Sequence, residues 1–201
     1  MSAADRVRRV VDVAVAASGL VLLSPLLATV AVAVRVRLGA PVLFRQRRSG
    51  RDGRPFELLK FRSMRSPAPG REAPEFDHER IDGFGRLLRS ASLDELPSLL
   101  NLLRGDITLV GPRPLPVQYL PRFTPDQRRR LEVKPGITGL AQVAGRNTVD
   151  WPERLALDVQ YVDTRTLRLD LSLLLRTVPM VLRRTGVDHA TGVTMKELQP
   201  Q

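Results

Sequence analysis

The chain of 201 residues contains no cysteine and only two histidines, His78 and His189. Disulfide bridges and thiolate metal sites are therefore excluded, and two histidines are too few for a histidine-based metal cage. Any bound metal would be held by carboxylate oxygens, which is typical of Mg²⁺. The chain is long enough for one domain with a substantial core.

Aromatic residues are also scarce, at 4% of the chain, which argues against a stacking platform for single-stranded nucleic acid. Basic residues, by contrast, are abundant. The formal net charge is +11, and nearly all of the 32 basic residues are arginine, the residue best suited to bidentate phosphate contacts. An anionic partner follows: nucleic acid, an anionic membrane face or a phosphorylated substrate.

Near the N-terminus, residues 13–34 form an uncharged and mostly apolar run of 22 residues. This length can cross a hydrocarbon core of roughly 30 Å. Both flanks are basic, with Arg6, Arg8 and Arg9 before the run and Arg35 and Arg37 after it. Basic flanks favour the cytoplasmic side, so a straight span would conflict with one of them.

The middle of this run contains Ser24-Pro25, where proline removes a backbone donor and kinks a helix. A helix that enters the membrane, bends at this pair and leaves on the same face satisfies both flanks, and Ser24 is placed to satisfy the carbonyl that Pro25 leaves without a partner. A simple spanning helix and a signal peptide cleaved after Ala31-Val32-Ala33 remain alternatives. The two basic flanks favour re-entry.

Local patterns predict the other elements. A β-hairpin is expected from the apolar segments 42–44 and 55–59 around the turn residues 49–53. Proline and glycine predict an exposed loop over 66–80. Helices are expected at 81–89, 95–104, after the N-cap Thr124, at 151–162 and around 171–182, with an extended segment at 107–110. The 171–182 helix either lies on an anionic membrane surface or packs into the core.

Two adjacent acids, Asp94 and Glu95, stand out in the segment Ser-Leu-Asp-Glu-Leu-Pro. Successive helical residues point about 100° apart, so the two carboxylates are expected to have different roles. They lie where a helix begins, and either Ser92 or Asp94 could be its N-cap, Asp94 leaving Pro97 in the tolerant first turn. The acids could be caps only. A helix N-terminus also keeps a carboxylate ionised, as a nucleophile or metal ligand.

Basic residues lie near this pair in the sequence. Arg86 and Arg89 precede it, Arg113 lies between two prolines, and Lys60 and Arg62 follow the predicted hairpin. Several cations near two carboxylates suggest a phosphate-binding site assisted by Mg²⁺. A basic surface that only rests on lipid head groups is the competing interpretation.

Four stretches together resemble the bacterial sugar transferase family, the small monotopic phosphoglycosyl transferases. They are KFRSM (60–64), RSASLDELPSLLNLLRGDITLVGPRP (89–114), KPGITGLAQVAGRN (134–147) and the region DVQYV…LRLDLSLLLRTV (158–178). With the Ser24-Pro25 helix, the similarity covers nearly the whole chain. It implies transfer of a sugar 1-phosphate from a UDP-sugar to polyprenyl phosphate, with release of UMP, as the first membrane step of polysaccharide or glycoconjugate biosynthesis, including exopolysaccharide.

The resemblance also implies the site residues. Asp94 would be the nucleophile that forms an aspartyl-phosphosugar intermediate, and Glu95, with Asp94, would bind Mg²⁺. Arg89 and Arg113 would hold phosphates. Further positions match recurrent family motifs, namely Lys60, Arg62 and Arg146 as phosphate-binding candidates and Asp158 as another site candidate.

The expected fold is α+β and mostly helical. Residues 1–38 would form a re-entrant membrane helix broken at Ser24-Pro25, and residues 39–201 a compact cytoplasmic catalytic domain with a small β-hairpin and interfacial amphipathic helices. The expected location is the cytoplasmic face of the inner membrane, with membrane lipid, a UDP-sugar and polyprenyl phosphate as partners, nucleic acid excluded and a homodimer left open. A non-catalytic membrane scaffold and a membrane-anchored nucleic-acid-binding protein are the competing functions, although no base-stacking or helix-turn-helix pattern supports the second. The sequence leaves the sugar and the polyprenol length open.

Overall fold

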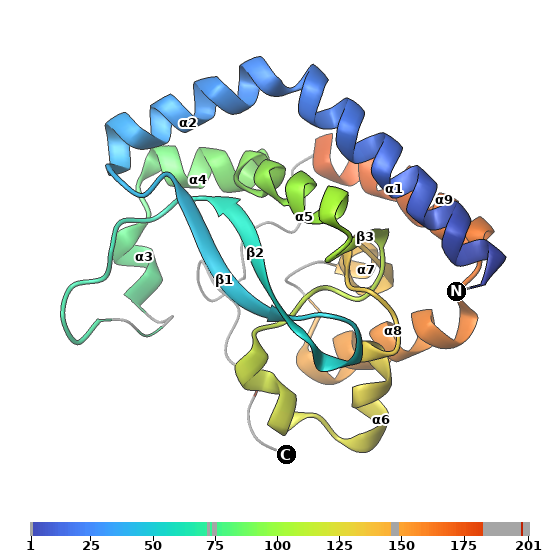
Figure 1. Ribbon diagram of the computed structural model, residues 1–201. Helices are drawn as coiled ribbons and strands as arrows, with labels where there is room; N and C mark the ends of the chain where they lie inside the picture. Colours follow the sequence, from blue (N-terminus) through green and yellow to red (C-terminus); the bar gives the residue numbers. More distant parts are fainter. Residues whose placement is uncertain (1, 72, 74–75, 146–148, 183–197, 199–201) are drawn as a thin grey trace.

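A computed structural model of the protein describes residues 2–71, 73, 76–145, 149–182 and 198 (Figure 1). It is mostly helical, as expected, with two small two-stranded sheets. The helices and strands are α1 (Ala3–Leu22), α2 (Ser24–Leu38), β1 (Leu43–Ser49), β2 (Pro55–Phe61), α3 (Asp77–Arg80), α4 (Gly83–Ser90), α5 (Leu99–Arg104), β3 (Thr108–Val110), α6 (Pro125–Arg128), β4 (Gly136–Thr138), α7 (Leu140–Gly145), α8 (Trp151–Thr164) and α9 (Leu167–Leu182). Short 3₁₀ helices cover Arg51–Gly53, Leu93–Ser98, Val117–Arg122 and Arg129–Leu131.

Helices α1 and α2 form a bent arm along one side of the molecule (Figure 1). They meet at Ser24-Pro25 with a bend of 65°. Pro25 cannot donate to the carbonyl of Val21, and the Ser24 hydroxyl donates to that oxygen instead, at 2.8 Å. The predicted break and the predicted role of Ser24 are thus confirmed. Within the described part of the chain, no helix alone has the length and apolarity of a membrane span, whereas α1 and α2 together do.

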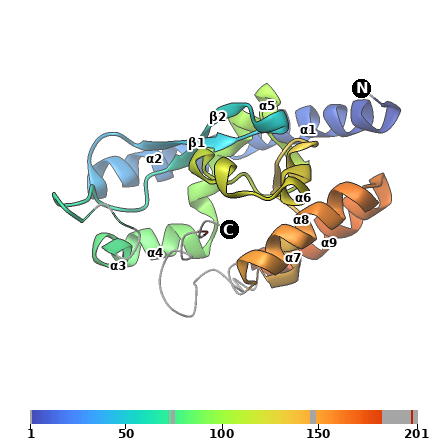
Figure 2. The ribbon, with the colours of Figure 1, turned by 90° about the horizontal axis from the view of Figure 1, so that it is seen from below.

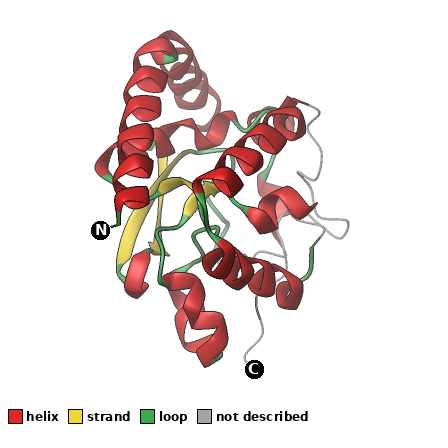
Figure 3. Cartoon of the chain, turned by 90° about the vertical axis from the view of Figure 1, so that its right-hand side faces the viewer, coloured by secondary structure: helices red, strands yellow, loops and turns green. Residues whose placement is uncertain are grey.

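The predicted hairpin is also confirmed. Strands β1 and β2 pair antiparallel, from Leu43 opposite Phe61 to Ser49 opposite Pro55. The connecting turn contains Asp52 and Gly53 at positive φ, 56° and 74°. Strands β3 and β4 form a second, parallel pair, so the expected extended segment at 107–110 lies within a sheet. In Figure 3 the strands lie beside the N-terminal helix, and most of the other helices lie on the other side of them.

The expected α-helix at 95–104 is only partly correct. Residues Leu93–Ser98 form a 3₁₀ helix, and the α-helix begins at Leu99. The Asp94 cap is wrong, because Asp94 lies inside the 3₁₀ helix. Ser92 does occupy the N-cap position, at φ 55°, but its side chain makes no capping bond, so the predicted capping box is absent. Pro97 offers no N–H and disfavours α geometry in the residue before it, which explains the irregular first turn. Gly105, at φ 90°, ends α5 as predicted.

The remaining predictions agree with the structure apart from their bounds. The helix predicted at 81–89 is α4, the capping box of Thr124 opens α6, and the helix predicted at 151–162 is α8. The loop predicted over 66–80 ends in the short helix α3. Figure 2 shows α7, α8 and α9 grouped at one end of the molecule and α3 and α4 at the other.

Helix α9 packs into the core, the second of the alternatives left open by its sequence, and also has an exposed apolar face. Leu173 is fully buried against Val110, Val133 and Tyr161 in one of the core clusters. The opposite face exposes an apolar stripe, which consists of Leu167, Leu171, Leu175 and Val178. The helix therefore packs on the domain and presents apolar side chains outward, as a helix at a membrane surface would.

Candidate functional site

Glu95 lies at the centre of a charged cluster. Its Oε1 accepts hydrogen bonds from Lys60 Nζ at 2.6 Å and from Arg113 Nη2 at 3.0 Å. Lys60 is near the end of β2, Glu95 is in the 3₁₀ helix before α5, and Arg113 follows β3. Three segments far apart in the sequence thus converge on one carboxylate.

Beside this carboxylate lies a small cavity of about 30 Å³. Four of its lining residues are charged, namely Arg48, Lys60, Glu95 and Arg113. The volume suits a water molecule or a group of similar size, so most of a larger ligand would lie outside it. Three cations around one carboxylate leave the cavity positive and favour a phosphate group.

Asp94 and Glu95 have opposite electrostatic environments. Asp94 is only 7% exposed, and burial raises the pKa of its carboxyl, outweighing the attraction of Lys60. Burial also acts to raise the pKa of Glu95, but the charges of Lys60 and Arg113 prevail and hold that pKa well below its usual range. Adjacent carboxyls whose pKa values are pushed apart are suited to different roles.

Arg48 is a site residue that the sequence reasoning missed. It lines the cavity, and its guanidinium donates to the carbonyl of Pro114, at 3.0 Å, and to the side chain of Gln46. Burial, and then repulsion by Arg113, lowers the pKa of Arg48 to about 10, so the group stays charged at neutral pH. The sequence did hold a signal for Arg48. Successive side chains of a strand point to opposite faces, so Arg48 lies on the other face of β1 from Arg45 and Arg47, which are exposed.

Arg89 and Arg62 were both predicted to bind phosphate, but the structure places them differently. Arg89 Nε donates to Ser63 Oγ at 3.1 Å, and its charge acts on Asp94, so it belongs to the same charged region. Arg62 instead donates to the carbonyls at the end of α2, among them those of Leu38 and, at 2.8 Å, Gly39. The structure therefore places Arg62 as a link between β2 and α2.

Asp158 lies behind the site rather than in it. It is 1% exposed and accepts hydrogen bonds from Arg130 Nε at 3.0 Å and Nη2 at 2.6 Å. Burial raises the pKa of Asp158, although Arg130 opposes this. Arg130 also donates to the backbone carbonyl of Arg113 at 2.7 Å. The buried pair thus supports the backbone that carries Arg113. Arg146 lies outside the described residues.

A metal ion would find few protein ligands here. Among the described residues, no group of three or more Asp, Glu, His or Cys side chains is arranged to hold one. The adjacent carboxylates of Asp94 and Glu95 offer two oxygen donors. Mg²⁺ commonly takes one or two protein carboxylates and completes its shell with water and substrate phosphates. The residues present therefore fit Mg²⁺ that binds together with a phosphorylated substrate.

Comparison with known proteins gives independent evidence on the family of this chain. Residues 3–184 match the family described as Bacterial sugar transferase. The chain is 49% identical over 169 residues to the uncharacterized sugar transferase EpsL of Bacillus subtilis. The aligned region covers 84% of this chain and 83% of EpsL. It is 43% identical over 190 residues to the UDP-glucose:undecaprenyl-phosphate glucose-1-phosphate transferase of Caulobacter vibrioides. The aligned region covers 90% of this chain and 71% of that protein. Identity to the undecaprenyl-phosphate galactose phosphotransferase of Salmonella typhimurium is 39% over 196 residues, covering 89% of this chain and 41% of that protein.

Proposed function

Because this chain belongs to the bacterial sugar transferase family, we propose that it transfers a sugar 1-phosphate from a UDP-sugar to a polyprenyl phosphate of the undecaprenyl type. The names of the Caulobacter and Salmonella relatives support this acceptor. The observation that carries the proposal is the charged cluster, in which Lys60 and Arg113 hold Glu95 beside the buried carboxyl of Asp94.

In the proposed reaction, a carboxylate oxygen of Asp94 attacks the phosphorus next to the sugar. The bond from that phosphorus to the bridging diphosphate oxygen breaks, and UMP leaves with the electron pair. An oxygen of polyprenyl phosphate then attacks the same phosphorus, which frees Asp94 and yields the polyprenyl-diphospho-sugar. A carboxylate nucleophile thereby divides one transfer into two displacements.

The surrounding residues bind the donor and neutralise its charge. Arg48, Lys60 and Arg113 present cations around the cavity, and the diphosphate would lie mostly at its mouth. Arg89, near Asp94, would meet the phosphate that is transferred. Bound to Glu95 and the substrate phosphates, Mg²⁺ would supply charge neutralisation for the departing UMP. Glu95 stays ionised because its pKa is depressed, which suits a ligand of a hard cation.

The membrane proposal is that α1 and α2, within residues 1–38, form a re-entrant membrane helix broken at Ser24-Pro25 and that residues 39–201 lie on the cytoplasmic face of the inner membrane. A feature of α1 supports it. Asp12 of α1 bonds to Thr108 and Leu109 of β3, which favours an arrangement with the start of α1 and the catalytic residues on the same side of the bilayer. A helix that spanned the membrane would separate them. The bend at Ser24-Pro25 supplies the return.

The test is UMP release from a panel of UDP-sugars, with purified full-length protein, Mg²⁺ and polyprenyl phosphate in detergent. One donor should be turned over, and omission of Mg²⁺ should abolish the reaction. Asp94→Asn is the matched inactive control because it keeps the shape of the side chain. A non-catalytic scaffold with the same fold predicts UMP release at the level of that control for every donor.

Intact-mass analysis tests the intermediate separately. With UDP-sugar alone, the native protein should release about one equivalent of UMP and gain the mass of one phosphosugar. A strict requirement for the acceptor before any UMP appears would exclude the covalent route and leave direct transfer.

A further inference from the structure

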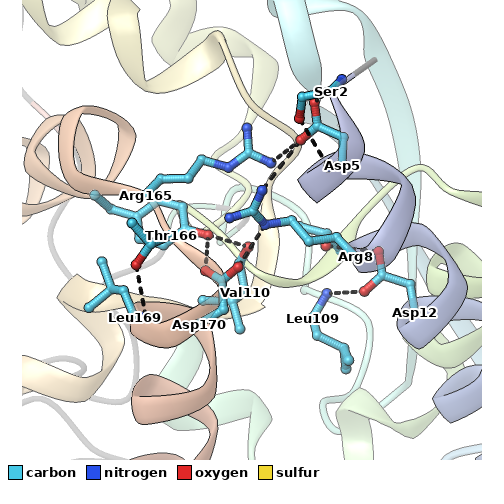
Figure 4. A network of polar contacts seen from close by, with 12 residues as sticks. Ser2, Asp5, Arg8, Asp12, Leu109, Val110, Arg165, Thr166, Leu169 and Asp170 are labelled. Atoms are coloured by element: carbon cyan, nitrogen blue, oxygen red, sulfur yellow. Dashed lines mark hydrogen bonds and ion pairs between the residues drawn. The ribbon is translucent and has the colours of Figure 1, made fainter.

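One face of α1 is polar although the helix leads into the apolar run. Four charged residues, Asp5, Arg8, Arg9 and Asp12, recur at the spacing i, i+3, i+4 and i+7, which places them on one side of the helix. All four bind the rest of the domain, and Figure 4 shows Asp5, Arg8 and Asp12. We name this face the α1 latch.

Asp12 is the most buried member of the latch, at 4% exposed. Its Oδ2 accepts from Thr108 Oγ1 at 2.8 Å, and its Oδ1 accepts from the backbone N–H of Leu109 at 2.9 Å. Both partners belong to β3. Moving α1 would leave the buried carboxylate and its two donors without hydrogen-bond partners, which costs free energy. Asp12 therefore holds the helix in a fixed position on β3.

The basic members of the latch engage two other elements. Arg9 donates to the carbonyls of Leu102 and Leu103 in α5, at 2.9 and 2.7 Å. Arg8 Nε donates to Asp170 of α9 at 2.6 Å. Figure 4 shows Arg8 and Asp170 pointing toward each other between the two helices.

The outermost member, Asp5, accepts from Arg165 Nη2 at 2.7 Å. Asp170 is itself held by the Tyr161 hydroxyl at 2.7 Å, and that hydroxyl lies 3.0 Å from the Val110 carbonyl of β3. The latch therefore reaches β3 directly through Asp12 and indirectly through Asp170.

The elements joined by the latch are those that carry the site. Strand β3 runs directly into Arg113, and α5 directly follows the 3₁₀ helix that contains Asp94 and Glu95. We propose that the α1 latch sets the depth of the active site relative to the bilayer, with Asp12 as its principal positioning residue. This inference rests on the proposed re-entrant arrangement.

The dimensions agree with this role. Twelve residues separate Asp12 from Ser24, and a helix rises 1.5 Å per residue, so the bend lies roughly 18 Å from the latch. Half of a hydrocarbon core is roughly 15 Å. Beyond Asp12 the exposed side chains of the arm are mainly apolar, including Val15, Val21, Leu22, Leu26, Val32 and Val36. Val7, Val10 and Val11 are exposed as well, so apolar surface runs along the outer side of α1 while the latch holds its inner side.

The arginines of α1 differ in whether they bind the domain. Arg8 and Arg9 bind protein groups, whereas Arg6 on the same helix is exposed. Arg6 and Arg9 therefore form a matched pair for testing, because Arg6→Gln and Arg9→Gln remove the same charge from the same helix and only the second breaks the latch.

The first readout is the depth of the bend. The native chain has no cysteine, so Val21→Cys, at a position 72% exposed, gives a single attachment site for a spin label. The labelled full-length protein is placed in liposomes, and its depth is measured by power saturation with oxygen and a water-soluble nickel complex. Asp12→Ala and Arg9→Gln should shift or broaden the depth by roughly 5 Å, one helical turn. Arg6→Gln should leave it unchanged.

The second readout compares two acceptors. With long-chain polyprenyl phosphate in the bilayer, Asp12→Ala should lower kcat/KM by about tenfold, in line with loss of a charge-assisted bond. With a water-soluble short-chain prenyl phosphate, the same variant should stay within about twofold of native, because the site itself is intact. Thr108→Val, which removes one of the two Asp12 bonds and keeps the carboxylate, should give a smaller change in the same direction.

Equal losses with both acceptors would overturn the proposal, because Asp12 would then only support the fold. An unchanged label depth in Asp12→Ala and Arg9→Gln would also overturn it. If the native protein turns over neither acceptor, the proposed function fails, and the label depth alone then decides the latch.

Discussion

Substituting each of the adjacent acids by its amide should have opposite effects on stability. In the folded protein the pKa of Asp94 is raised, chiefly by burial. Its stabilising contribution is therefore present below the ordinary value of 3.8 and is lost as the pH rises through the raised pKa. At pH 7 the buried charge is a net cost, and Asp94→Asn removes it.

For Glu95 the sign is reversed. Its pKa is depressed because Lys60 and Arg113 outweigh burial, so its contribution is present above the ordinary value of 4.5 and is lost as the pH falls through the depressed pKa. At pH 7, Glu95→Gln keeps the acceptor oxygen and loses the charge from two bonds of 2.6 and 3.0 Å.

The magnitudes follow from burial and contact. Relief of a destabilising buried group in Asp94→Asn is worth about 1 kcal/mol. Each bond to Glu95 loses about 1 kcal/mol of charge assistance. The three side chains are 18%, 30% and 37% exposed, so solvent screening reduces the two bonds together to about 1 kcal/mol. For a chain of this length, each kcal/mol shifts Tm by about 2–4 °C.

Thermal unfolding of the purified variants at pH 7 measures these shifts, and UMP release measures activity. Asp94→Asn should raise Tm and abolish turnover. Glu95→Gln should lower Tm and raise the Mg²⁺ concentration required for half-maximal rate. A lower Tm together with normal turnover in Asp94→Asn would refute both the buried-charge argument and the nucleophile assignment. An unaltered Mg²⁺ requirement in Glu95→Gln would limit that residue to holding Lys60 and Arg113.

Three further outcomes are expected. Arg48→Gln should lower kcat/KM for the UDP-sugar by about 10–100-fold through loss of a charged phosphate contact. Arg47 is exposed on the same strand, so Arg47→Gln should be near native. Equal steady-state kinetics for the two variants would remove Arg48 from the site. In a pH profile of kcat/KM, the rate should fall as the pH drops through the raised pKa of Asp94, so an acid limb at or below the ordinary value of 3.8 would contradict the raised pKa. Replacing Ser24 and Pro25 by leucine and alanine should straighten the arm and give mixed topology, detected as partial labelling of a Ser2→Cys variant by a membrane-impermeant maleimide in intact cells. Full labelling of that cysteine with the native pair would show a spanning helix instead.

Several local features could be predicted from the sequence because they depend on neighbouring residues. Ser24-Pro25 bends the arm because the ring removes a donor wherever the chain is placed. The turn at 49–53 creates the hairpin, and Gly105 ends α5 by adopting a positive φ. The different roles expected of Asp94 and Glu95 stay a prediction, although their pKa values do shift in opposite directions.

Other predictions required contacts between distant segments. The capping interpretation of Asp94 was wrong because a 3₁₀ turn, not an α-helix, begins at Leu93. Arg62 has the same sequence neighbourhood as Lys60, yet it lies just beyond the last residue of β2, and its side chain binds the end of α2. Asp158 was grouped with the site, and the fold places it behind Arg113 instead.

The sequence by itself determined where this chain bends, turns and becomes apolar, because those properties arise within a few consecutive residues. Only the tertiary structure decided which charges meet. Glu95, Lys60 and Arg113 are separated by 35 and 18 residues, and Asp12 lies 96 residues from Thr108. Whether a carboxyl keeps its proton or holds a helix in place depends on the groups that folding brings within a few ångströms, and no local pattern encodes that distance.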